Sequence, residues 1–263
     1  MDVVGYGVSR LALVPVRKEP VQMAEQNTQL LFGDHYEVLE VSKNEKWILI
    51  RVHMDHTEGW IDVLQHHEIT KEYFDQINHA NFKITTDITS NILYKKSPLT
   101  ILIGSVVPIS GSELFKMEEQ FAFNGDSKSL GQKRDLEFIK EIAQKYINSP
   151  FLPGGKSPFG IDSSAFVQMV YRLAGYQLPR DLRSLAVEGQ LVEDFNQHRL
   201  GDIAFFKNTI GKIHHAGICL ENHKIIHVHG HVRIDQLSTY GIASAETGKV
   251  IHGIDHIQRI ISA

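Results

Sequence analysis

Gly154-Gly-Lys-Ser-Pro-Phe-Gly-Ile-Asp-Ser-Ser-Ala-Phe166 is the stretch that decides the fold of this chain. Its first half is a loop rich in glycine and proline, and the residues after it place apolar side chains at helical spacing as far as Gly175. This pattern predicts a helix that begins near Asp162. Unpaired N–H groups at a helix start favour negative charge, so a cysteine at position 163 would be a ready thiolate nucleophile. This chain has Ser163 there.

The segments around this stretch predict an α+β fold, because helices come first and strands follow. Residues 135–147 have apolar side chains at helical spacing, and Asn148-Ser-Pro150 ends that helix. The predicted strands are 202–206, 215–220, 224–228 and 231–235. Together they predict one domain over residues 129–263.

The first 128 residues carry strand patterns instead. Short runs rich in β-branched and aromatic residues, spaced as in a small barrel, lie at 11–16, 36–41, 46–52 and 58–62. A second, less regular β unit has candidate strands at 82–86, 91–94 and 99–107. We therefore expect domains at residues 1–70 and 71–128.

Composition limits the classes of function. A formal net charge of -4 gives no basic field to hold a phosphate backbone, so no nucleic-acid partner is expected. No apolar run is long enough for a membrane span, and the first residues do not read as a secretory signal, so we expect a cytoplasmic protein without a membrane partner. The single Cys219 excludes an intrachain disulfide and fits a small buried side chain.

Two histidines in successive predicted strands are candidates for acid–base chemistry. With Ser163 as nucleophile, His215 could act as base and His227 could orient it, as in a catalytic triad. The plain alternative is that Asp162 or Ser163 only caps a helix and that the histidines are ordinary strand residues.

A metal site is a rival of another class. The chain has 15 histidines, and His227, His229 and His231 alternate as on one face of a strand. Zinc accepts such ligands, but Gly230 indicates a turn that would break the alternation. We therefore assign no metal and no cofactor from the sequence.

The motifs resemble those of the NlpC/P60 family of papain-like peptidases. They are Phe151-Leu-Pro-Gly-Gly155, Gly160-Ile-Asp-Ser-Ser-Ala-Phe166, Gly201-Asp-Ile-Ala-Phe-Phe206, His215-Ala-Gly-Ile218 and Ile225-Ile-His227. The resemblance implies a papain-like domain with Ser163 in the nucleophile position, His215 as base and His227 as orienter. It further implies substrate contacts for Phe151 and, to the peptide backbone or terminal amine, for Asp162 and Ser164.

The N-terminal part is similar to the SH3-type module of one subgroup, the γ-D-glutamyl–L-diamino acid endopeptidases of dipeptidyl-peptidase VI type. The similar segments are Val14-Pro-Val-Arg-Lys-Glu-Pro20, Gln29-Leu-Leu-Phe-Gly-Asp34 and Glu58-Gly-Trp-Ile-Asp62. The resemblance implies peptidoglycan-derived partners with a free N-terminal L-Ala, whose amine Glu25 could pair. Trp60 is a further candidate for a peptide contact in this part, although we favour a place in the barrel core for it.

The sequence departs from the family pattern at the residues that matter most. Ser163 replaces the cysteine, Phe151 lacks a phenolic hydroxyl, Pro153 replaces tryptophan and Ala165 replaces glycine. We expect a hydrolase fold with lost or strongly reduced activity. Three alternatives stay open: a non-catalytic protein that binds or senses muropeptides, an active enzyme inactivated by substitution, and a serine hydrolase that uses Ser163 and His215.

Overall fold

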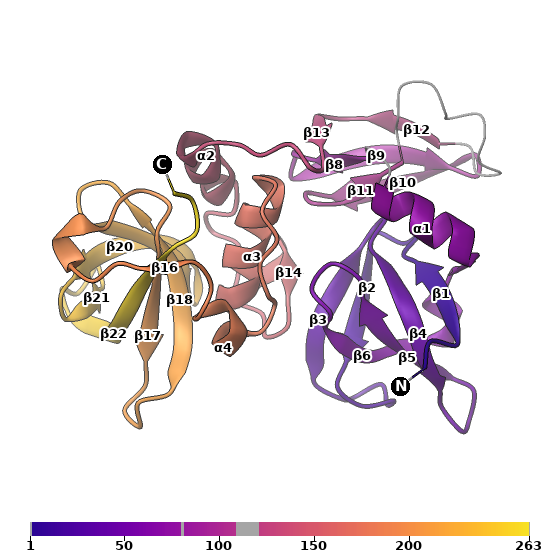
Figure 1. Cartoon of the computed structure of the whole chain (residues 1–263), viewed down its shortest axis with the longest axis horizontal. Helices are drawn as coiled ribbons and strands as arrows, with labels where there is room; N and C mark the ends of the chain where they lie inside the picture. The colour runs from indigo at the N-terminus through magenta and orange to yellow at the C-terminus, as the bar shows by residue number, and fades with distance from the viewer. Residues whose placement is uncertain (1, 80–81, 109–120, 263) are drawn as a thin grey trace. The chain divides into compact units, whose positions relative to one another are not determined.

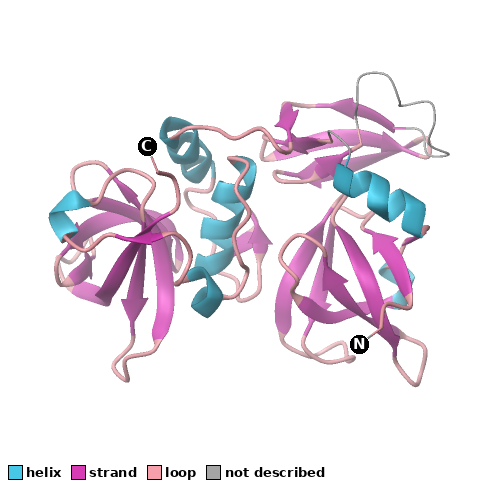
Figure 2. Ribbon diagram, viewed as in Figure 1, coloured by secondary structure: helices cyan, strands magenta, loops and turns pink. Residues whose placement is uncertain are grey.

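The structure is a computed structural model, and it describes residues 2–79, 82–108 and 121–262. The chain forms two compact units (Figure 1). The first contains residues 1–132 and 153–158, and the second contains residues 133–152 and 159–263. Helices and strands both occur (Figure 2), which confirms the α+β class.

The first unit begins with a seven-stranded sheet in the order β3-β2-β6-β5-β4-β1-β7. Its elements are β1 (Gly5–Val8), β2 (Leu13–Arg17), β3 (Gln26–Leu31), β4 (His35–Val41), β5 (Trp47–Val52), β6 (Glu58–Asp62), η1 (Val63–Gln65) and β7 (Glu68–Ile69). The pairings between neighbouring strands are antiparallel. All four strands predicted for this region are confirmed, with ends shifted by no more than two residues.

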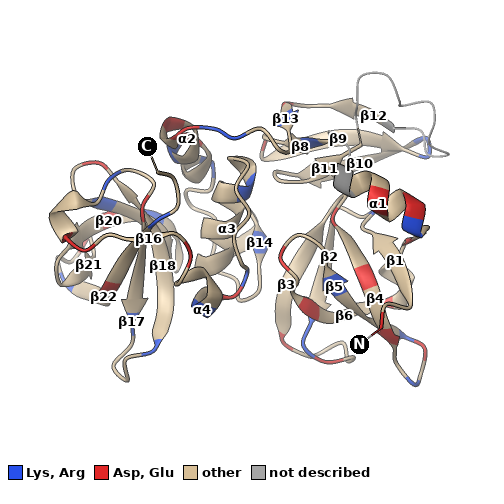
Figure 3. Ribbon diagram, viewed as in Figure 1, with Lys and Arg blue, Asp and Glu red and all other residues tan. Residues whose placement is uncertain are grey.

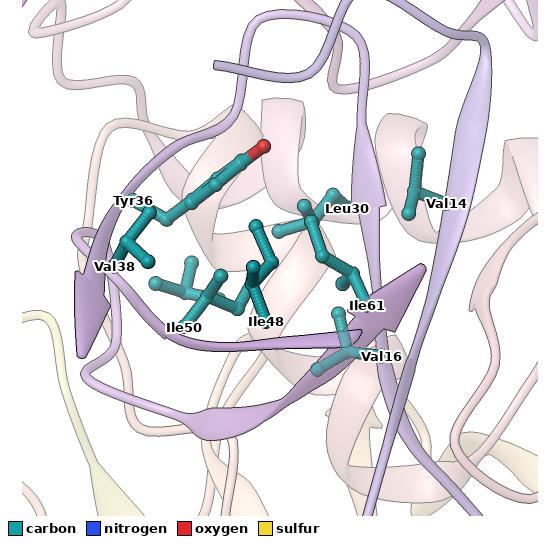
Figure 4. Close-up of a cluster of buried hydrophobic side chains, with 9 residues drawn as sticks. Val14, Val16, Leu30, Tyr36, Val38, Ile48, Ile50 and Ile61 are labelled. Atoms are coloured by element: carbon teal, nitrogen blue, oxygen red, sulfur yellow. The ribbon is translucent and has the colours of Figure 1, made fainter. Parts of the chain in front are cut away.

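One face of this sheet forms an apolar core, because alternate residues of a strand point to the same side. The core side chains shown in Figure 4 are Val14, Val16, Leu30, Tyr36, Val38, Ile48, Ile50, Val52 and Ile61. Trp60 is only half-buried, whereas the next residue, Ile61, is fully buried. The core position that we favoured for Trp60 is therefore held by Ile61, and that expectation was wrong.

The described residues in the rest of the first unit form one helix and two three-stranded sheets, ordered β10-β9-β12 and β11-β8-β13. Its elements are α1 (Lys71–His79), β8 (Lys83–Thr85), β9 (Thr89–Tyr94), β10 (Ser97–Leu102), β11 (Val106–Val107), β12 (Phe121–Asn124) and β13 (Ser127–Ser129). Helix α1 was missed, although Tyr73 and Ile77 have helical spacing and both pack into an apolar cluster with Phe82. Of the range 71–128, residues 80–81 and 109–120 lie outside the described residues.

The run predicted as one strand over 99–107 is two strands, β10 and β11. Gly104 has φ 85°, and the N–H of Ser105 donates to the carbonyl of Leu102 over 3.0 Å. This turn reverses the chain because glycine adopts a positive φ without steric cost. The β-branched residues on both sides of Gly104 predict a continuous strand, so the turn was missed.

The second unit contributes the predicted helices. Its non-barrel elements are α2 (Leu136–Lys145), β15 (Gly160–Ile161), α3 (Ser163–Leu173), α4 (Leu182–Leu185) and η2 (Phe195–Gln197), whereas β14 (Lys156–Ser157) lies in the first unit. The Asp162 carboxylate accepts from the N–H of Ala165 over 2.9 Å and caps α3. Gly175, with φ 85°, follows the end of the helix, as predicted.

A barrel completes the second unit, in the order β22-β17-β18-β19-β20-β21 with β21 paired back to β22, and β16 lies on its edge. Its strands are β16 (Gln190–Leu191), β17 (Ile203–Lys207), β18 (Ile213–Leu220), β19 (Lys224–His229), β20 (His231–Ser238), β21 (Gly241–Ala243) and β22 (Val250–Arg259). Strands β17 to β20 were predicted, and β21 and β22 were not. Cys219 is fully buried in the barrel core, as expected.

Acidic and basic residues are interspersed in both units (Figure 3). Within the described ranges, no helix combines the length and the apolar character that crossing a membrane requires.

Candidate active site

Three polar side chains point into the barrel at one end. Each is an even number of residues from a barrel-core residue of the same strand, and so shares its face. The pairs are His215 with Cys219 in β18, His227 with Ile225 in β19, and Asp235 with Leu237 in β20. The period of two along these strands therefore brings His215, His227 and Asp235 into one interior.

A glycine makes room for the second imidazole. Gly217 pairs with His227 across β18 and β19, and a Cβ added to Gly217 would lie 2.8 Å from the Cβ of His227. Such a contact is tighter than two carbon atoms tolerate. Gly217 in the His-x-Gly motif thus lets His227 lie diagonally next to His215.

The three side chains form a hydrogen-bonded chain. His215 Nε2 lies 2.9 Å from His227 Nδ1, and His227 Nε2 lies 2.9 Å from a carboxylate oxygen of Asp235. All three residues are buried. The structure therefore brings the predicted base and the predicted orienter into direct contact, and it adds Asp235 behind them.

Asp235 is held as an anion. Burial alone would raise its pKa, but hydrogen bonds from the Ala245 N–H, His227 and Arg233 outweigh burial, so the pKa of Asp235 lies below its usual range. The Ala245 N–H donates to the carboxylate over 2.7 Å, and Arg233 Nε lies 2.9 Å from it. The Asp235 carboxylate, at the end of the hydrogen-bonded series, is thus held from two sides.

The anion determines where the protons lie. Asp235 can only accept, so His227 donates through Nε2–H and keeps a lone pair on Nδ1. His215 must then donate its Nε2–H to that lone pair, which leaves its own Nδ1 without a proton. Because His215 Nδ1 makes no hydrogen bond to any described residue, it can accept a proton from a nucleophile.

Burial also keeps these imidazoles neutral. It lowers the pKa of His227 to about 4, despite the opposing effect of Asp235. Burial and the neighbouring histidines hold the pKa of His215 well below its ordinary value. At neutral pH, His215 is therefore a neutral base and does not rest as an imidazolium.

His252 is a further member of the site that the sequence did not reveal. It lies on β22, opposite Ile242 of the barrel core. Its ring stacks on His215 with 4.1 Å between centroids and 12° between planes. Its pKa is lowered to about 3, mainly by burial. The missed strand β22 explains the missed histidine.

Ser163 begins α3, and this helix packs against β18 and β19, the strands that carry His215 and His227. Ser163 is largely buried, with 9% of its surface exposed. Its hydroxyl makes no hydrogen bond to another described residue. The predicted place of Ser163 at the helix start is confirmed, and its role as nucleophile stays a prediction.

The side chains on either side of Ser163 are bound to Arg180. Arg180 Nη2 lies 2.6 Å from the Asp162 carboxylate, and Nη1 lies 2.6 Å from the Ser164 hydroxyl. Arg180 is itself buried. The substrate contacts expected of Asp162 and Ser164 stay predictions, and any such contact would be made by groups that Arg180 already holds.

Phe151 is half exposed, with a relative exposure of 50%. Its backbone is fixed, because its N–H donates to the carbonyl of Gly230 over 2.9 Å and it forms a parallel bridge with Ile161. An exposed ring on a fixed backbone is available for a ligand, and its expected role in binding stays a prediction.

The other two candidate residues, Glu25 and Trp60, lie in the first unit. Glu25 forms an exposed ion pair with Lys18, with 2.8 Å between Oε1 and Nζ. Trp60 pairs with Leu49 and Arg17 in the sheet. Their proposed roles in peptide binding stay predictions.

The three histidines that the sequence offered as zinc ligands, at positions 227, 229 and 231, do not lie on one face of a strand. Gly230 has φ 73° and separates His229 from His231, which pair across the resulting turn. His227 is buried, whereas His229 is exposed at the strand end. The histidines that gather around His227 come from other strands instead.

This fold and this site define an NlpC/P60 domain. Residues 148–250 match the NlpC/P60 family, and residues 16–64 match the bacterial dipeptidyl-peptidase SH3 domain. The predicted architecture, a papain-like NlpC/P60 domain preceded by an SH3-like β domain, is confirmed. The predicted domain boundaries at residues 70 and 128 stay predictions, and so does the SH3-like character of residues 71–128.

Individual relatives agree with this assignment. The chain is 27% identical over 213 residues to the γ-D-glutamyl-L-lysine dipeptidyl-peptidase of Bacillus subtilis, covering 76% of this chain and 71% of the relative. It is distantly related to that protein. A crystal structure of an NlpC/P60 family protein from Bacillus cereus superposes with a TM-score of 0.83 at 17% identity, covering 98% of this chain and 100% of the other. An NlpC/P60 endopeptidase from Photobacterium damselae gives a TM-score of 0.72 at 14% identity, covering 95% and 70%.

Proposed function

We propose that this protein binds short cell-wall peptides of the γ-D-glutamyl–L-diamino acid type with a free N-terminal L-Ala, and that its power to hydrolyse them is lost or strongly reduced. The distant relationship to a γ-D-glutamyl-L-lysine dipeptidyl-peptidase supports the substrate class. The observation that carries the proposal is the Asp235–His227–His215 chain in a domain whose helix start bears Ser163.

Ser163 limits the chemistry for a physical reason. A thiol has a pKa of about 8.5, and a helix start lowers it further, whereas a serine hydroxyl loses its proton only during attack. The neutral His215 must therefore take that proton as the hydroxyl attacks. Loss of an activated nucleophile costs up to about 10⁶ in rate in a triad.

Two functions follow from this arrangement. In the first, the site binds or senses muropeptides without turnover, in the context of peptidoglycan recycling. In the second, Ser163 and His215 act as a slow serine hydrolase. The lowered pKa of His215 meets one requirement of the second function, because a serine needs a general base that is unprotonated at neutral pH.

One experiment separates these functions. L-Ala-γ-D-Glu-L-Lys and its meso-diaminopimelate analogue are mixed with the full chain, binding is followed by calorimetry, and release of L-Ala-D-Glu is followed by chromatography. Binding without product supports the binder, and product that disappears in Ser163→Ala supports the serine hydrolase. If neither peptide binds and neither is cleaved, the proposed function is wrong.

The Ser163→Cys variant sharpens the result. If the site beyond the nucleophile is intact, cysteine should raise product release by several powers of ten, and His215→Ala in the same background should abolish it. Ser184→Cys, in the short helix α4, is the matched control and should leave the rate of the wild-type chain unchanged.

We also propose a cytoplasmic location, where free muropeptides would be the substrates. The single cysteine, buried as Cys219, supports a protein that needs no disulfide. Fractionation of the native host with an antibody against the chain tests this, and recovery outside the cytoplasm would contradict it.

A further inference from the structure

The hydrogen-bonded side chains of His215, His227 and Asp235 are called the relay below. Further histidine side chains gather at the same end of the barrel. The members of this cluster are His214, His215, His227, His229 and His252. One ring nitrogen from each of His215, His227 and His252 lies within 4.8 Å of the corresponding nitrogens of the other two. Three imidazole nitrogens at such distances from one another are the donor set that zinc accepts.

His227 is already arranged as a metal ligand. Its Nε2–H donates to Asp235 over 2.9 Å, so the lone pair of Nδ1 points away from the carboxylate and toward His215. A carboxylate behind a histidine in this way fixes the tautomer and raises the basicity of the donor nitrogen. Asp235 is in turn fixed by Arg233 and Ala245.

The spacing of His215 and His227 requires little rearrangement, whereas a nitrogen of His252, which lies within 4.8 Å of theirs, would have to approach them. Zinc–nitrogen bonds of about 2.0–2.1 Å at tetrahedral angles separate the ligand nitrogens by about 3.3–3.4 Å. His215 and His227 are 2.9 Å apart at their closest nitrogens. They would open by about 0.4 Å, and the metal would replace the proton on Nε2 of His215 while Nδ1 of the same ring takes up a proton, so that the ring binds as a neutral imidazole.

His252 completes the set from the exposed side. One of its nitrogens lies 3.1 Å from His214 Nε2, and the other lies 3.1 Å from His229 Nδ1. Either bond could be exchanged for a metal bond, and both neighbours are exposed imidazoles at the mouth of the site.

We propose that His215, His227 and His252 bind one zinc ion, with Asp235 as the hydrogen-bonded support of His227 and an open fourth position for water or for His214 or His229. The site differs from the sequential trio of His227, His229 and His231, because two of its ligands come from β18 and β22. A bound ion would occupy imidazoles of the relay, so zinc and proton transfer by His215 exclude each other.

The test uses the chelator-treated full chain without any peptide, so its outcome is independent of the proposed function. Zinc is titrated by calorimetry, and Co²⁺ is titrated by visible absorption, which reports tetrahedral coordination. We expect one ion per chain. We expect His252→Phe, which keeps an aromatic ring against His215, to weaken zinc binding at least tenfold, and Asp235→Asn to weaken it about 10–100-fold.

His231→Phe is the matched control, because His231 lies on the same hairpin outside the proposed set, and it should bind zinc like the wild-type chain. Circular dichroism shows whether each variant is folded, and His252→Gln replaces His252→Phe if the latter is not. A crystal of the wild-type chain grown with zinc would locate the ion by anomalous scattering. Absence of zinc binding by the wild-type chain, equal affinity in His252→Phe, or an ion bound elsewhere would overturn the proposal.

Discussion

The two large β structures of this chain fill their interiors differently. The first sheet has a core cluster of apolar and aromatic side chains, among them Val14, Ile50 and Ile61, and neither a carboxylate nor an imidazole belongs to that cluster. The barrel of the second unit has an apolar core of the same kind, but at one end it also buries His215, His227 and Asp235. The difference shows which interior serves only stability and which also serves chemistry.

The first sheet shows what folding alone requires. Burying each large aliphatic side chain contributes about 1.5–3 kcal/mol, and the core cluster contains no group that is charged at neutral pH. Burying a carboxylate and two imidazoles has a cost, and that cost is offset only by close hydrogen bonds. The buried polar chain of the barrel is therefore best explained by function.

Asp235→Ala should have the largest effect. It leaves the buried His227 Nε2–H and the Ala245 N–H without their acceptor, and breaking such a buried pair destabilises by about 3–5 kcal/mol. Amide hydrogen exchange of β18–β20 measures this in the barrel. Asp75→Ala, which breaks the exposed ion pair with Lys71, is the control and should cost less than about 1 kcal/mol. Equal effects would contradict the account.

Replacing both polar partners sharpens the comparison. The double variant His227→Leu with Asp235→Leu converts this part of the barrel toward the composition of the first sheet. It removes both partners of the His227–Asp235 bond, but it also takes away the acceptors of the His215 Nε2–H and the Ala245 N–H. It should therefore remain less stable than the wild-type chain, but by less than the sum of the two single changes. A loss of stability equal to the sum of the two single changes would argue that the relay supports folding in its own right.

The barrel should lose stability in mild acid. His227 is neutral in both the folded and unfolded states above pH ~6.5, and below that pH the unfolded chain takes up a proton that the folded chain rejects until its pKa of about 4. Stability therefore falls as the pH drops from ~6.5 to ~4, by about 3 kcal/mol for His227.

Amide hydrogen exchange in β19 measures this loss of stability in the second unit alone. Tryptophan fluorescence would report the first unit instead, because both tryptophans, Trp47 and Trp60, lie there. The first unit has lowered pKa values of its own at His53 and His66, through burial. In the His227→Leu variant the acid-dependent loss in β19 should be smaller. An unchanged pH profile would exclude His227 as its cause.

Gly217→Ala should have a smaller effect on stability and a clear effect on the site. The added methyl group would meet His227 Cβ at 2.8 Å and Ile225 Cδ1 at 2.9 Å. Such overpacking costs about 1–3 kcal/mol and would displace His227 from His215. Gly253→Ala in β22 is the control, since its nearest contact would be 4.0 Å away. Thermal unfolding of both variants measures the difference.

Local pattern was enough to predict much of the fold. The helices at 136–145 and 163–173 and the strands that carry His215 and His227 follow from short-range periodicity and capping residues such as Asp162. Helix α1 and strands β21 and β22 were missed, because their patterns are short or interrupted, as at Gly253 in β22.

The rest of the site depends on pairings that periodicity does not give. His252 reaches His215 only through the closure of β22 on β17 and β21. Asp235 ends the predicted strand 231–235, but its contact with His227 depends on the register of β19 and β20, in which it lies opposite Ile225. Residues that are distant in sequence meet here through tertiary structure.

The direct test of the account is the protonation of His215 and His227, read from the ¹⁵N chemical shifts of the imidazoles at neutral pH in the wild-type chain. We predict that both rings are neutral and carry their proton on Nε2, so that the Nδ1 of His215 is bare. An imidazolium at His215, or a proton on its Nδ1, would contradict the relay from which the proposed chemistry is derived.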